Sequence, residues 1–468
     1  MSKIIFAVPP IRMDEIWGEL ASEGSVLPPL GISILAAVTR SNGYDTKIMD
    51  FLAEGTGLDG ALEKITRERP DYVGITATTD TLNAAVAFAS KIKERDSGII
   101  TLIGGAHLSA MPVETMEKFS CFDYGFVGES EDTILGFLNA FGSKRDLSQI
   151  KGLVIRKDGK SIYTGAQQPI TDMDRIPFPA WDLLPDIRKY YKPAMINYKR
   201  EPTTSLVTSR GCAGQCIFCD ASVFGRRVRA YSSDYVIKAI ETLMKNYGIR
   251  EVCFYDDTFV AFKKRLSEIC NFIIDKKLDI SWSCNARVNL VDPDMLKLMR
   301  RAGCWQIAYG IESGSQRVLD TLKKGIKIEQ IRNAIKWTKE AGISTKGFFM
   351  IGSPGETRED IDMTRRLMMG IELDDVLVEY FTPYPGAEVY NKISDYGTFK
   401  PRFGKSSTFS MNFVPYGLTA EYLEEQFKGF YKSFYMRPRI ILNYIARLGS
   451  IKKMWLLLLK FIKFSSKK

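Results

Sequence analysis

Short apolar runs alternate with amphipathic stretches over the first third of the chain. The runs are rich in β-branched residues and are predicted as strands at Ile4–Val8, Thr46–Asp50, Tyr72–Thr76, Ile99–Gly104 and Tyr124–Gly128. Helical spacing of apolar residues lies between them, near Pro29–Ser41, Leu58–Glu68, Leu82–Glu94 and Val113–Phe119, and again after Ser130. This alternation predicts a Rossmann-like, doubly wound parallel sheet over residues 1–145.

The pattern breaks between residues 146 and 200. The segment Leu153–Tyr163 carries Asp158-Gly159 at its centre, which is typical of a β-hairpin turn. A proline- and aromatic-rich segment, Ile176–Pro185, follows and has no regular period. We therefore expect residues 146–200 to form a linker that contains a hairpin.

A second alternation occupies residues 201–395. Its predicted strands are Thr204–Thr208, Glu251–Tyr255, Ile280–Cys284, Gln306–Gly310, Thr345–Ile351 and Asp375–Phe381, and its helices include Ser233–Tyr247 and Pro293–Ala302. Six βα units predict a partial (β/α)6 barrel of the TIM type, with its site at the carboxyl ends of the strands. The fold class is thus α/β, completed by a small helical C-terminal region over residues 396–468.

The carboxyl ends of the N-terminal strands carry small and polar residues. They read Pro9-Pro10, Thr76–Thr79, Gly104–His107 and Gly128-Glu129. Ligands of doubly wound sheets bind beyond these ends, and glycine lets a flat or phosphate-bearing ligand approach the backbone. The alternative is that these segments are ordinary tight turns between strands and helices.

Charge is concentrated at one end of the chain. The net charge is +10, and the ten Lys/Arg residues after residue 430, with no Asp or Glu among them, account for all of it. A uniformly basic nucleic-acid-binding surface is therefore not expected. The sequence shows no signal-peptide core and no uninterrupted apolar run long enough to span a bilayer, so a cytoplasmic location is expected.

Three of the eight cysteines are clustered in Cys212-Ala-Gly-Gln-Cys216-Ile-Phe-Cys219, directly after the first barrel strand. Three thiolates at this spacing can hold a cubane cluster and leave one iron open to a ligand, whereas an all-cysteine electron-transfer cluster uses four. Zinc is the alternative, but it requires a fourth ligand. The chain has one histidine, His107, so Cys253 or Cys284 would have to complete a zinc site.

This loop resembles the hallmark of the radical SAM superfamily. The resemblance implies a [4Fe–4S] cluster held by the three cysteines, whose open iron binds the amino and carboxylate groups of S-adenosylmethionine (SAM). Segments that resemble the later strand motifs follow in order: Phe254–Phe259, Trp282–Arg287, Tyr309–Gly314 and Phe348–Glu356. By this resemblance the SAM-binding residues are Phe218, Asp256, Arg287, Glu312, Ser313 and Gly352.

The N-terminal part is similar to the cobalamin-binding class of this superfamily. The similarity rests on Leu27-Pro-Pro-Leu-Gly31, Gly104-Gly-Ala-His107 and Val127-Gly-Glu129. It implies a cobalamin site at Pro9, Leu27, Gly31, Thr76, Gly104, Gly105, His107, Gly128 and Glu129. The loop after the first strand lacks the histidine that many cobalamin proteins use to ligate cobalt. We therefore expect no histidine on cobalt, and His107 is expected near the nucleotide tail or as a turn residue.

The resemblance implies an enzyme. Reductive cleavage of SAM would give a 5′-deoxyadenosyl radical, which takes hydrogen from an unactivated C–H bond before methylcobalamin delivers a methyl group. A flavodoxin- or ferredoxin-type donor would reduce the cluster. Oxidative cyclisation, C–C coupling or ring rearrangement is the second expectation, and a non-catalytic cobalamin or redox sensor is a third. Only Cys121 lies in the N-terminal part and none follows Cys304, so a single cluster is expected.

The basic tail is amphipathic. Between Phe434 and Phe464, apolar residues including Trp455 share one side at helical spacing, while lysines fall on the other. This pattern predicts an interfacial helix on an anionic membrane, with a helix packed on the barrel as the alternative. The tail also resembles those of family members that act on hopanoids, membrane lipids and porphyrins. A hydrophobic, lipid- or isoprenoid-like substrate and peripheral association with the inner face of the membrane are expected.

Overall fold

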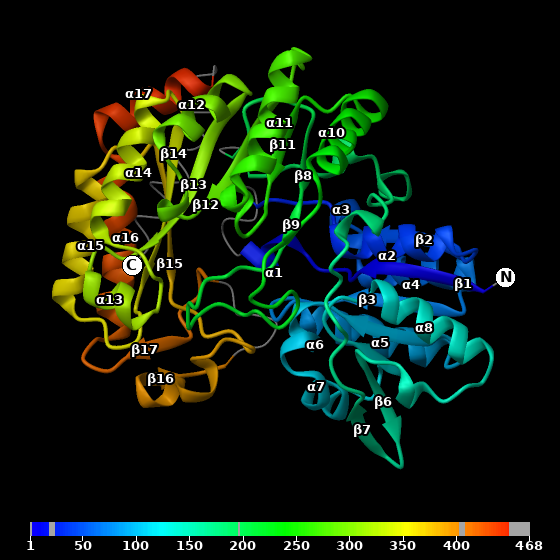
Figure 1. The fold of residues 1–468 in the computed structure, drawn as a ribbon. Coiled ribbons are helices and arrows are strands. Elements are labelled where there is room, and N and C mark those ends of the chain that lie inside the picture. Colours follow the sequence, from blue (N-terminus) through cyan, green and yellow to red (C-terminus); the bar gives the residue numbers. More distant parts are fainter. Residues whose placement is uncertain (1, 18–23, 195–196, 402–407, 449–468) are drawn as a thin grey trace.

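The computed structural model describes residues 2–17, 24–194, 197–401 and 408–448. Two α/β parts lie side by side, with the N-terminal sheet on one side and the barrel sheet on the other (Figure 1). The C-terminal helices pack at the far end of the barrel sheet. The predicted fold class is confirmed.

Seven strands form the N-terminal sheet, in the order β2-β1-β3-β4-β5-β6-β7. The first five strands are parallel. The strands are β1 (Lys3–Val8), β2 (Asp45–Asp50), β3 (Tyr72–Thr76), β4 (Ile100–Gly104), β5 (Tyr124–Phe126), β6 (Leu153–Lys157) and β7 (Lys160–Tyr163). The flanking helices are α1 (Met13–Trp17), α2 (Leu30–Ser41), α3 (Phe51–Glu54), α4 (Leu58–Glu68), α5 (Leu82–Arg95), α6 (Ala106–Ala110), α7 (Pro112–Lys118) and α8 (Glu131–Gly142).

The predicted hairpin is present and continues this sheet. Strand β6 pairs antiparallel with β5 through Gly125 and Phe126, and β7 pairs with β6. Gly125 faces Val154 and Leu108 so closely that an added Cβ would lie 2.9 Å from the Leu108 side chain. The hairpin therefore covers the edge of β5 that a purely parallel sheet would leave open.

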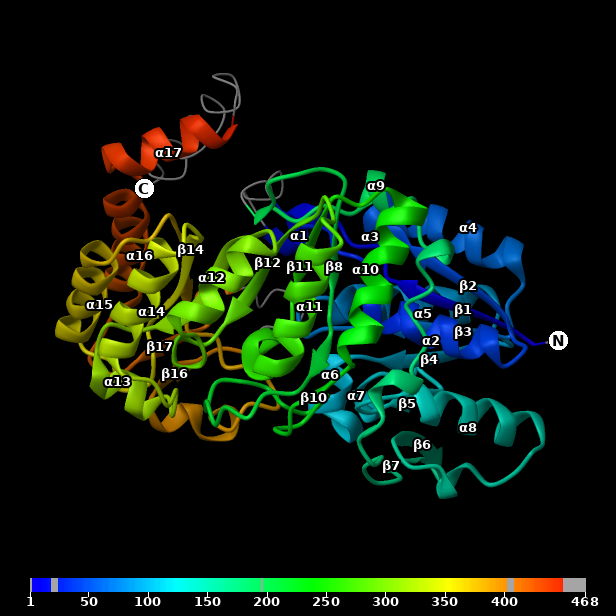
Figure 2. The same cartoon turned by 45° about the horizontal axis from the view of Figure 1, so that its top comes forward.

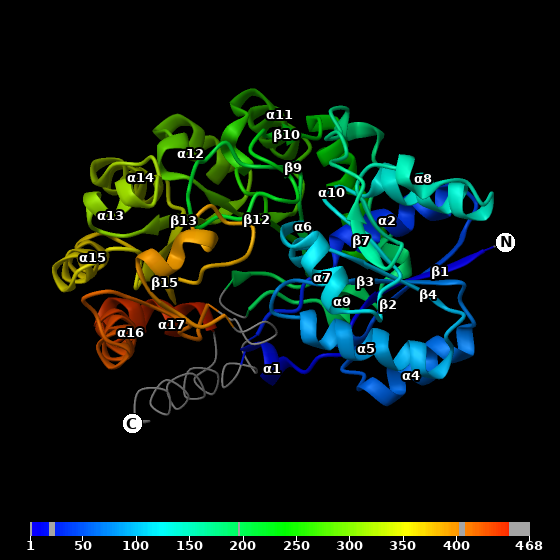
Figure 3. The same ribbon diagram turned by 90° about the horizontal axis from the view of Figure 1, so that it is seen from below.

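The second sheet is a curved, six-stranded parallel half-barrel in the order β15-β14-β13-β12-β11-β8 (Figure 3). Its strands are β8 (Thr203–Leu206), β11 (Glu251–Phe254), β12 (Ser281–Ala286), β13 (Cys304–Glu312), β14 (Ser344–Ile351) and β15 (Asp375–Tyr380). The helices that cover its outer face are α10 (Ser233–Tyr247), α11 (Lys263–Asp275), α12 (Pro293–Arg301), α13 (Gln316–Thr321), α14 (Ile328–Glu340) and α15 (Arg358–Gly370). The remaining short elements are α9 (Ile187–Tyr190) in the linker, β9 (Ser209–Arg210), β10 (Arg229–Ala230), β16 (Gly397–Phe399) and β17 (Phe413–Pro415).

One hydrophobic core runs through both parts. It joins residues of β1 and α2 to the barrel helices through linker side chains such as Ile170, Trp181 and Tyr191, which are all buried. A second core lies on the other face of the N-terminal sheet, under α4 and α5. Buried side chains of the linker thus pack into the core that joins the two parts, which lie side by side in Figure 2.

Two helices follow the barrel, α16 (Ala420–Tyr435) and α17 (Pro438–Leu448). The hydroxyl of Tyr435 donates to Asp375 and to the Val376 carbonyl on β15, and Tyr444 also donates to Asp375. The first half of the basic tail is therefore a helix packed on the barrel, as the alternative prediction held. The second half, residues 449–468, lies outside the described residues.

Candidate functional site

The cysteine loop leaves the barrel after β8 and returns at β10. Strands β9 and β10 pair antiparallel, with Arg210 opposite Arg229, so they close the base of a loop that spans residues 211–228. Gly211 has a φ of +83°, and a Cβ there would lie 2.5 Å from the Arg227 carbonyl oxygen. The loop can therefore fold back on itself only because glycine occupies its first position.

Asp256 anchors the end of the strand that leads into this loop. Its Oδ1 accepts hydrogen bonds from the Thr208 backbone (3.0 Å), the Thr208 hydroxyl (2.8 Å) and the Ser209 hydroxyl (2.6 Å). Burial raises the pKa of Asp256, while the nearby Arg265 guanidinium opposes that rise. Asp256 was predicted to bind SAM. In the structure its Oδ1 contacts Thr208 and Ser209, so it fixes the end of the strand that leads to Cys212.

The three cysteines lie in one loop beside Arg287. The Cys212 sulfur accepts from the Gly214 backbone at 3.4 Å, and the Cys216 sulfur accepts from Arg287 Nη1 at 3.8 Å. Partial desolvation, followed by the nearby Cys216 thiol, raises the pKa of Cys219 to about 11, and Lys324 opposes the rise. A metal centre that binds the Cys219 sulfur must therefore displace its proton.

The three thiolates of the loop are a donor set that suits a cluster. Across the described ranges, no three His, Cys, Asp or Glu side chains converge on a point where one metal ion could sit. In a cubane each thiolate ligates a different iron, so three cysteines in one loop would hold three of the four irons.

A buried ion pair adjoins the loop. Lys324 Nζ lies 2.5 Å from Glu312 Oε1 and 5.8 Å from the centre of the Phe218 ring. The Lys324 carbonyl accepts a hydrogen bond from Arg287. An added Cβ at Gly310 would lie 2.6 Å from Glu312 Oε1 and 2.7 Å from Lys324 Nζ, so a side chain at this glycine would disrupt the pair. Three predicted SAM residues, Phe218, Arg287 and Glu312, are thus brought together.

Lys324 itself was missed from the sequence. It follows α13 in a Leu-Lys-Lys-Gly segment in which either lysine could be a solvent-exposed residue. Its neighbour Lys323 is half exposed and pairs with Glu388, whereas the side chain of Lys324 is 9% exposed. A buried lysine needs an anionic partner, but nothing in the spacing of the sequence identifies that partner as Glu312.

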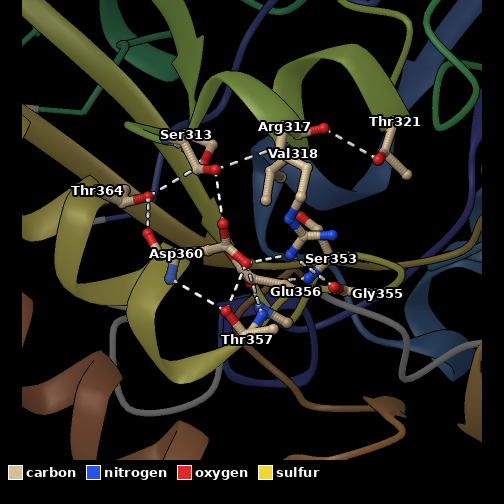
Figure 4. A network of polar contacts seen from close by, with 12 residues as sticks. Ser313, Arg317, Val318, Thr321, Ser353, Gly355, Glu356, Thr357, Asp360 and Thr364 are labelled. Carbon is tan, nitrogen blue, oxygen red and sulfur yellow. Dashed lines mark hydrogen bonds and ion pairs between the residues drawn. The ribbon is translucent and has the colours of Figure 1, made fainter.

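Ser313 belongs to a separate polar network with Thr364 and Asp360 (Figure 4), and Gly352 bonds to Glu356 in the neighbouring loop. The buried Ser313 hydroxyl lies 3.0 Å from the Thr364 hydroxyl and accepts from the Ser315 backbone at 3.1 Å. Gly352 has a φ of +81°, and its N–H donates to Glu356 Oε2 at 2.6 Å. Burial raises the pKa of Glu356 to about 8. In the structure these residues shape the loops after β13 and β14.

A cavity of about 150 Å³ opens at the N-terminal sheet. Six of the predicted cobalamin residues line it: Gly31, Thr76, Gly104, Gly105, Gly128 and Glu129. Gly105 has a φ of +108°, and a Cβ there would lie 2.5 Å from the Ala77 carbonyl oxygen. Glycine at position 105 therefore lets the turn after β4 pack against the Ala77 backbone beside the cavity. The other three, Pro9, Leu27 and His107, are not among the lining residues.

His107 lies on α6 at the same edge of the sheet. Its Nδ1 is 3.1 Å from the Thr79 hydroxyl, and the ring is 2% exposed. Burial, and to a lesser extent the charge of Lys118, lowers the pKa of His107 to about 4. The histidine is therefore neutral at physiological pH and already contacts a protein hydroxyl.

One wall of the cavity comes from the barrel side of the molecule. Arg210, Val223 and Phe224 line it, and Val223 and Phe224 follow Cys219 within the cysteine loop. Glu129 faces this wall and forms ion pairs with Arg229 and Arg210. These wall residues were missed because their position depends on how the two sheets pack, which no local pattern reveals.

Comparison with known proteins gives concordant results for both parts. Residues 206–368 match the model of the Radical SAM superfamily, and residues 18–138 match that of the B12 binding domain. The chain is 34% identical, over 90% of its length and 90% of the relative's, to an uncharacterized methyltransferase of Pyrococcus horikoshii. It is 30% identical to the anaerobic magnesium-protoporphyrin IX monomethyl ester cyclase of Rubrivivax gelatinosus, covering 79% of this chain and 66% of that protein.

A solved structure shares the fold across both sheets. The radical S-adenosylmethionine methyltransferase TsrM from Kitasatospora setae, solved with cobalamin and a [4Fe–4S] cluster, superposes with a TM-score of 0.69. The match covers 84% of this chain and 75% of that one at 18% sequence identity. The arrangement of a parallel sheet followed by a half-barrel is therefore common to the two proteins.

Proposed function

Because the chain belongs to the cobalamin-binding radical SAM family, we propose that it methylates an unactivated C–H bond of a hydrophobic substrate. Its cofactors are a [4Fe–4S] cluster, SAM and cobalamin. When bound, they supply reductive cleavage of SAM, hydrogen abstraction and a transferable methyl group. The observation that carries the proposal is the shared wall, because Val223 and Phe224 of the cysteine loop line the cavity at the N-terminal sheet.

The residues of the chain act by binding and orientation. Cys212, Cys216 and Cys219 would hold the cluster. Arg287, Glu312 and Phe218, which all contact Lys324 beside the loop, would bind SAM. The glycine-lined cavity at Gly104, Gly105 and Gly128 would receive part of the cobalamin. Since His107 is neutral and bonded to Thr79, we assign it a supporting role in the loop rather than cobalt ligation.

Cyclisation is the second candidate, since a relative at 30% identity is named as a cyclase. The two reactions differ in the fate of the methyl group of SAM. We propose an assay in which anaerobically reconstituted protein, hydroxocobalamin, reductant and methyl-labelled SAM are incubated with an extract of cells that lack the gene. Methylation predicts label in a new extract product together with 5′-deoxyadenosine. Cyclisation predicts deoxyadenosine and a new product without label, and a sensor predicts neither.

The electron donor is proposed to be a flavodoxin or ferredoxin. The assay above therefore includes a parallel reaction in which reduced flavodoxin replaces the chemical reductant. We expect deoxyadenosine in both reactions if the cluster accepts electrons from a protein donor. Deoxyadenosine with the chemical reductant alone would contradict this choice of donor and leave the enzyme class untouched.

Association with membranes is proposed for residues 449–468. This segment holds six lysines and no acidic residue, next to Trp455 and four consecutive leucines. Each lysine near an anionic bilayer contributes about 1 kcal/mol, and the apolar side chains add to this. No helix within the described ranges is long and apolar enough to cross a membrane.

The cut that tests the tail must spare α16 and α17. A truncation after Phe430 would delete Tyr431 and Tyr435, whose hydroxyls bond to β15. Truncation after Leu448 preserves both. We expect the full chain to sediment with vesicles that contain anionic lipid and the truncated chain to stay in solution, with unchanged iron content. A full chain that ignores such vesicles would contradict the proposal.

A further inference from the structure

Two buried arginines lie at the base of the cysteine loop. Arg210 on β9 and Arg229 on β10 are register partners, so two positive charges face each other where the loop begins and ends. Their side chains are 5% and 6% exposed, respectively. Two buried positive charges on paired residues are unfavourable unless anions neutralise them.

The neutralising carboxylates come from the N-terminal part. Glu129 Oε2 accepts from Arg229 Nη1 at 2.9 Å, and Glu129 Oε1 pairs with Arg229 Nη2. Glu131, at the start of α8, pairs with Arg210 at 2.5 Å. Glu129 Oε2 also accepts from the Ile170 backbone at 3.1 Å, which ties in the linker. Glu129 and Glu131 side chains are 4% and 10% exposed, respectively.

The same arginines hold the part of the loop that walls the cavity. Arg229 Nη2 donates to the Phe224 carbonyl at 3.1 Å, and the Arg210 guanidinium lies 5.3 Å from the centre of the Phe224 ring. Across the cavity, a Cβ at Gly128 would lie 3.7 Å from the Val223 carbonyl oxygen, so backbones from the two parts are in close approach. Glu129, Glu131, Arg210, Val223 and Phe224 all line the cavity.

The segment that carries the cysteines thus also supplies one wall of the cavity, and Arg210 and Arg229 hold it at its base. A ligand in the cavity must lie against Val223 and Phe224. Any restraint it places on them acts on the segment that also carries Cys216 and Cys219. Because each buried charge has its partner on the other part of the molecule, removing one partner leaves an uncompensated charge at the base of the loop.

We propose that the pairs Glu129–Arg229 and Glu131–Arg210 couple cobalamin binding to the order of the cysteine loop. They act as positioning residues, and the proposal rests on the proposed function. Filling the cavity stabilises the loop in its cluster-holding conformation, and by linkage a loop that holds its cluster binds cobalamin more tightly. This coupling would protect the cluster at Cys219, whose side chain is exposed, when both cofactors are present.

The test measures loss of iron from the cluster in the full-length protein. Anaerobically reconstituted protein is exposed to a chelator with and without saturating hydroxocobalamin, and iron release is followed by absorbance. We expect hydroxocobalamin to slow iron release from the wild-type protein about tenfold, within the usual range of coupling between sites. Glu129→Gln is measured at a hydroxocobalamin concentration that saturates the variant, and the ratio of the two rates should then fall toward one.

The matched control is Asp132→Asn. Asp132 is next to Glu131 on α8 and forms an exposed ion pair with Arg175. Asp132→Asn therefore makes the same acid-to-amide change outside the two buried ion pairs. We expect it to keep the full protection. If Glu129→Gln does not fold, Glu131→Gln serves instead, because it removes one carboxylate of the other pair and leaves the Glu129–Arg229 pair in place.

The outcomes separate the two proposals. Wild-type protein that binds hydroxocobalamin one to one, yet releases iron at the same rate with and without it, overturns the coupling and leaves the proposed function standing. Protection that survives in Glu129→Gln or, where that variant does not fold, in Glu131→Gln overturns the assignment to these residues. Protein that holds its cluster but binds no hydroxocobalamin overturns the proposed function itself.

Discussion

The cavity at the N-terminal sheet and the site at the cysteine loop are built from different kinds of residue. The cavity at the N-terminal sheet is lined by glycines whose backbone conformation or lack of a Cβ keeps its walls open, as at Gly104 and Gly105. Beside the cysteine loop lie charged side chains with close partners, Lys324 paired with Glu312 and Arg287 donating to the Cys216 sulfur. We propose that the first site recognises its ligand by shape and the second by charge.

This difference predicts opposite sensitivities. A site defined by shape is damaged by added atoms. A site defined by charge is damaged by isosteric loss of a charge and tolerates small changes of volume. Substitutions of each kind, applied to each site, therefore separate the roles of the two sheets.

The largest effect is expected at the cysteine loop. Cys216→Ala removes a buried thiol beside Arg287 and leaves the cluster with two protein ligands. We expect the iron–sulfur absorbance and deoxyadenosine production to be abolished. The iron content after anaerobic reconstitution measures the first, and chromatography of the products measures the second. Hydroxocobalamin binding should persist, although more weakly if the coupling proposed above holds.

Cys121→Ala is the control for this change. Cys121 is a half-buried free thiol at the N-terminal sheet, outside the loop. We expect it to keep a full cluster. A Cys216→Ala protein that still cleaves SAM would show that the loop is not the cluster site.

Added bulk in the cavity should break the shape-based site alone. A Cβ at Gly104 would sit 3.7 Å from Phe126, so the strand accommodates it, but a leucine side chain must extend into the cavity. Overpacking of about 2–3 kcal/mol corresponds to roughly a 30- to 150-fold weaker complex. We expect Gly104→Leu to weaken hydroxocobalamin binding by that factor in equilibrium titrations, while iron content stays unchanged.

Gly142→Leu provides the matched change at an open position. Gly142 ends α8, and a Cβ added there would have no neighbouring atom within 4 Å. We expect this variant to bind hydroxocobalamin as the wild-type protein does. Unchanged hydroxocobalamin affinity in Gly104→Leu would mean that cobalamin does not use this cavity.

The sequence predicts the elements better than their contacts. The buried strands β3 and β14 were predicted nearly to the residue, because apolar runs between turn residues signal strands locally. The hairpin was also predicted, but its pairing with β5 was not, since strand pairing is a long-range choice. The order of the strand motifs brought Phe218, Arg287 and Glu312 into one region as expected.

The ion-pair and hydrogen-bond partners of the site residues could not be predicted from the sequence. Glu129 was placed at the cavity by its position after β5, yet its partners Arg210 and Arg229 lie far along the chain. Asp256 follows its strand in the pattern of a ligand, but its carboxylate bonds to Thr208 and Ser209. Such choices depend on packing between sheets, which leaves no periodic trace in the sequence.

Loss of one charge should break the charge-based site moderately. Lys324→Gln keeps a hydrogen-bond donor near Glu312 but removes the ammonium group beside Phe218. Loss of a charged hydrogen bond costs about 1.5 kcal/mol, or roughly tenfold in affinity. We expect SAM binding to weaken by about that factor in equilibrium dialysis, with hydroxocobalamin binding unchanged. The neighbouring Lys323→Gln, at a half-exposed ion pair with Glu388, should leave SAM binding as it is.

The smallest effect is expected at His107, which lies at the shape-based site but outside its lining. Its pKa is lowered to about 4 by burial, against an ordinary value near 6.5. Between these two pH values the unfolded chain binds a proton that the folded chain refuses, so stability is complete above pH 6.5 and falls as the pH drops toward 4. His107→Gln should remove about 1–2 kcal/mol of that acid-induced loss in urea unfolding at pH 7 and pH 4.5.

The same variant tests the cobalt environment. Since Nδ1 of His107 lies 3.1 Å from the Thr79 hydroxyl and the ring does not line the cavity, the histidine is held by the protein rather than offered to a ligand. His107→Gln should therefore leave the visible spectrum of bound hydroxocobalamin unchanged, with at most a few-fold loss of affinity as the loop around Thr79 relaxes. The EPR spectrum of the Co(II) form should show no nitrogen splitting from protein in either the wild-type or the variant chain. Splitting that is present in the wild type and lost in His107→Gln would make the histidine a cobalt ligand, and the N-terminal site would then recognise its cofactor by a specific donor as well as by shape.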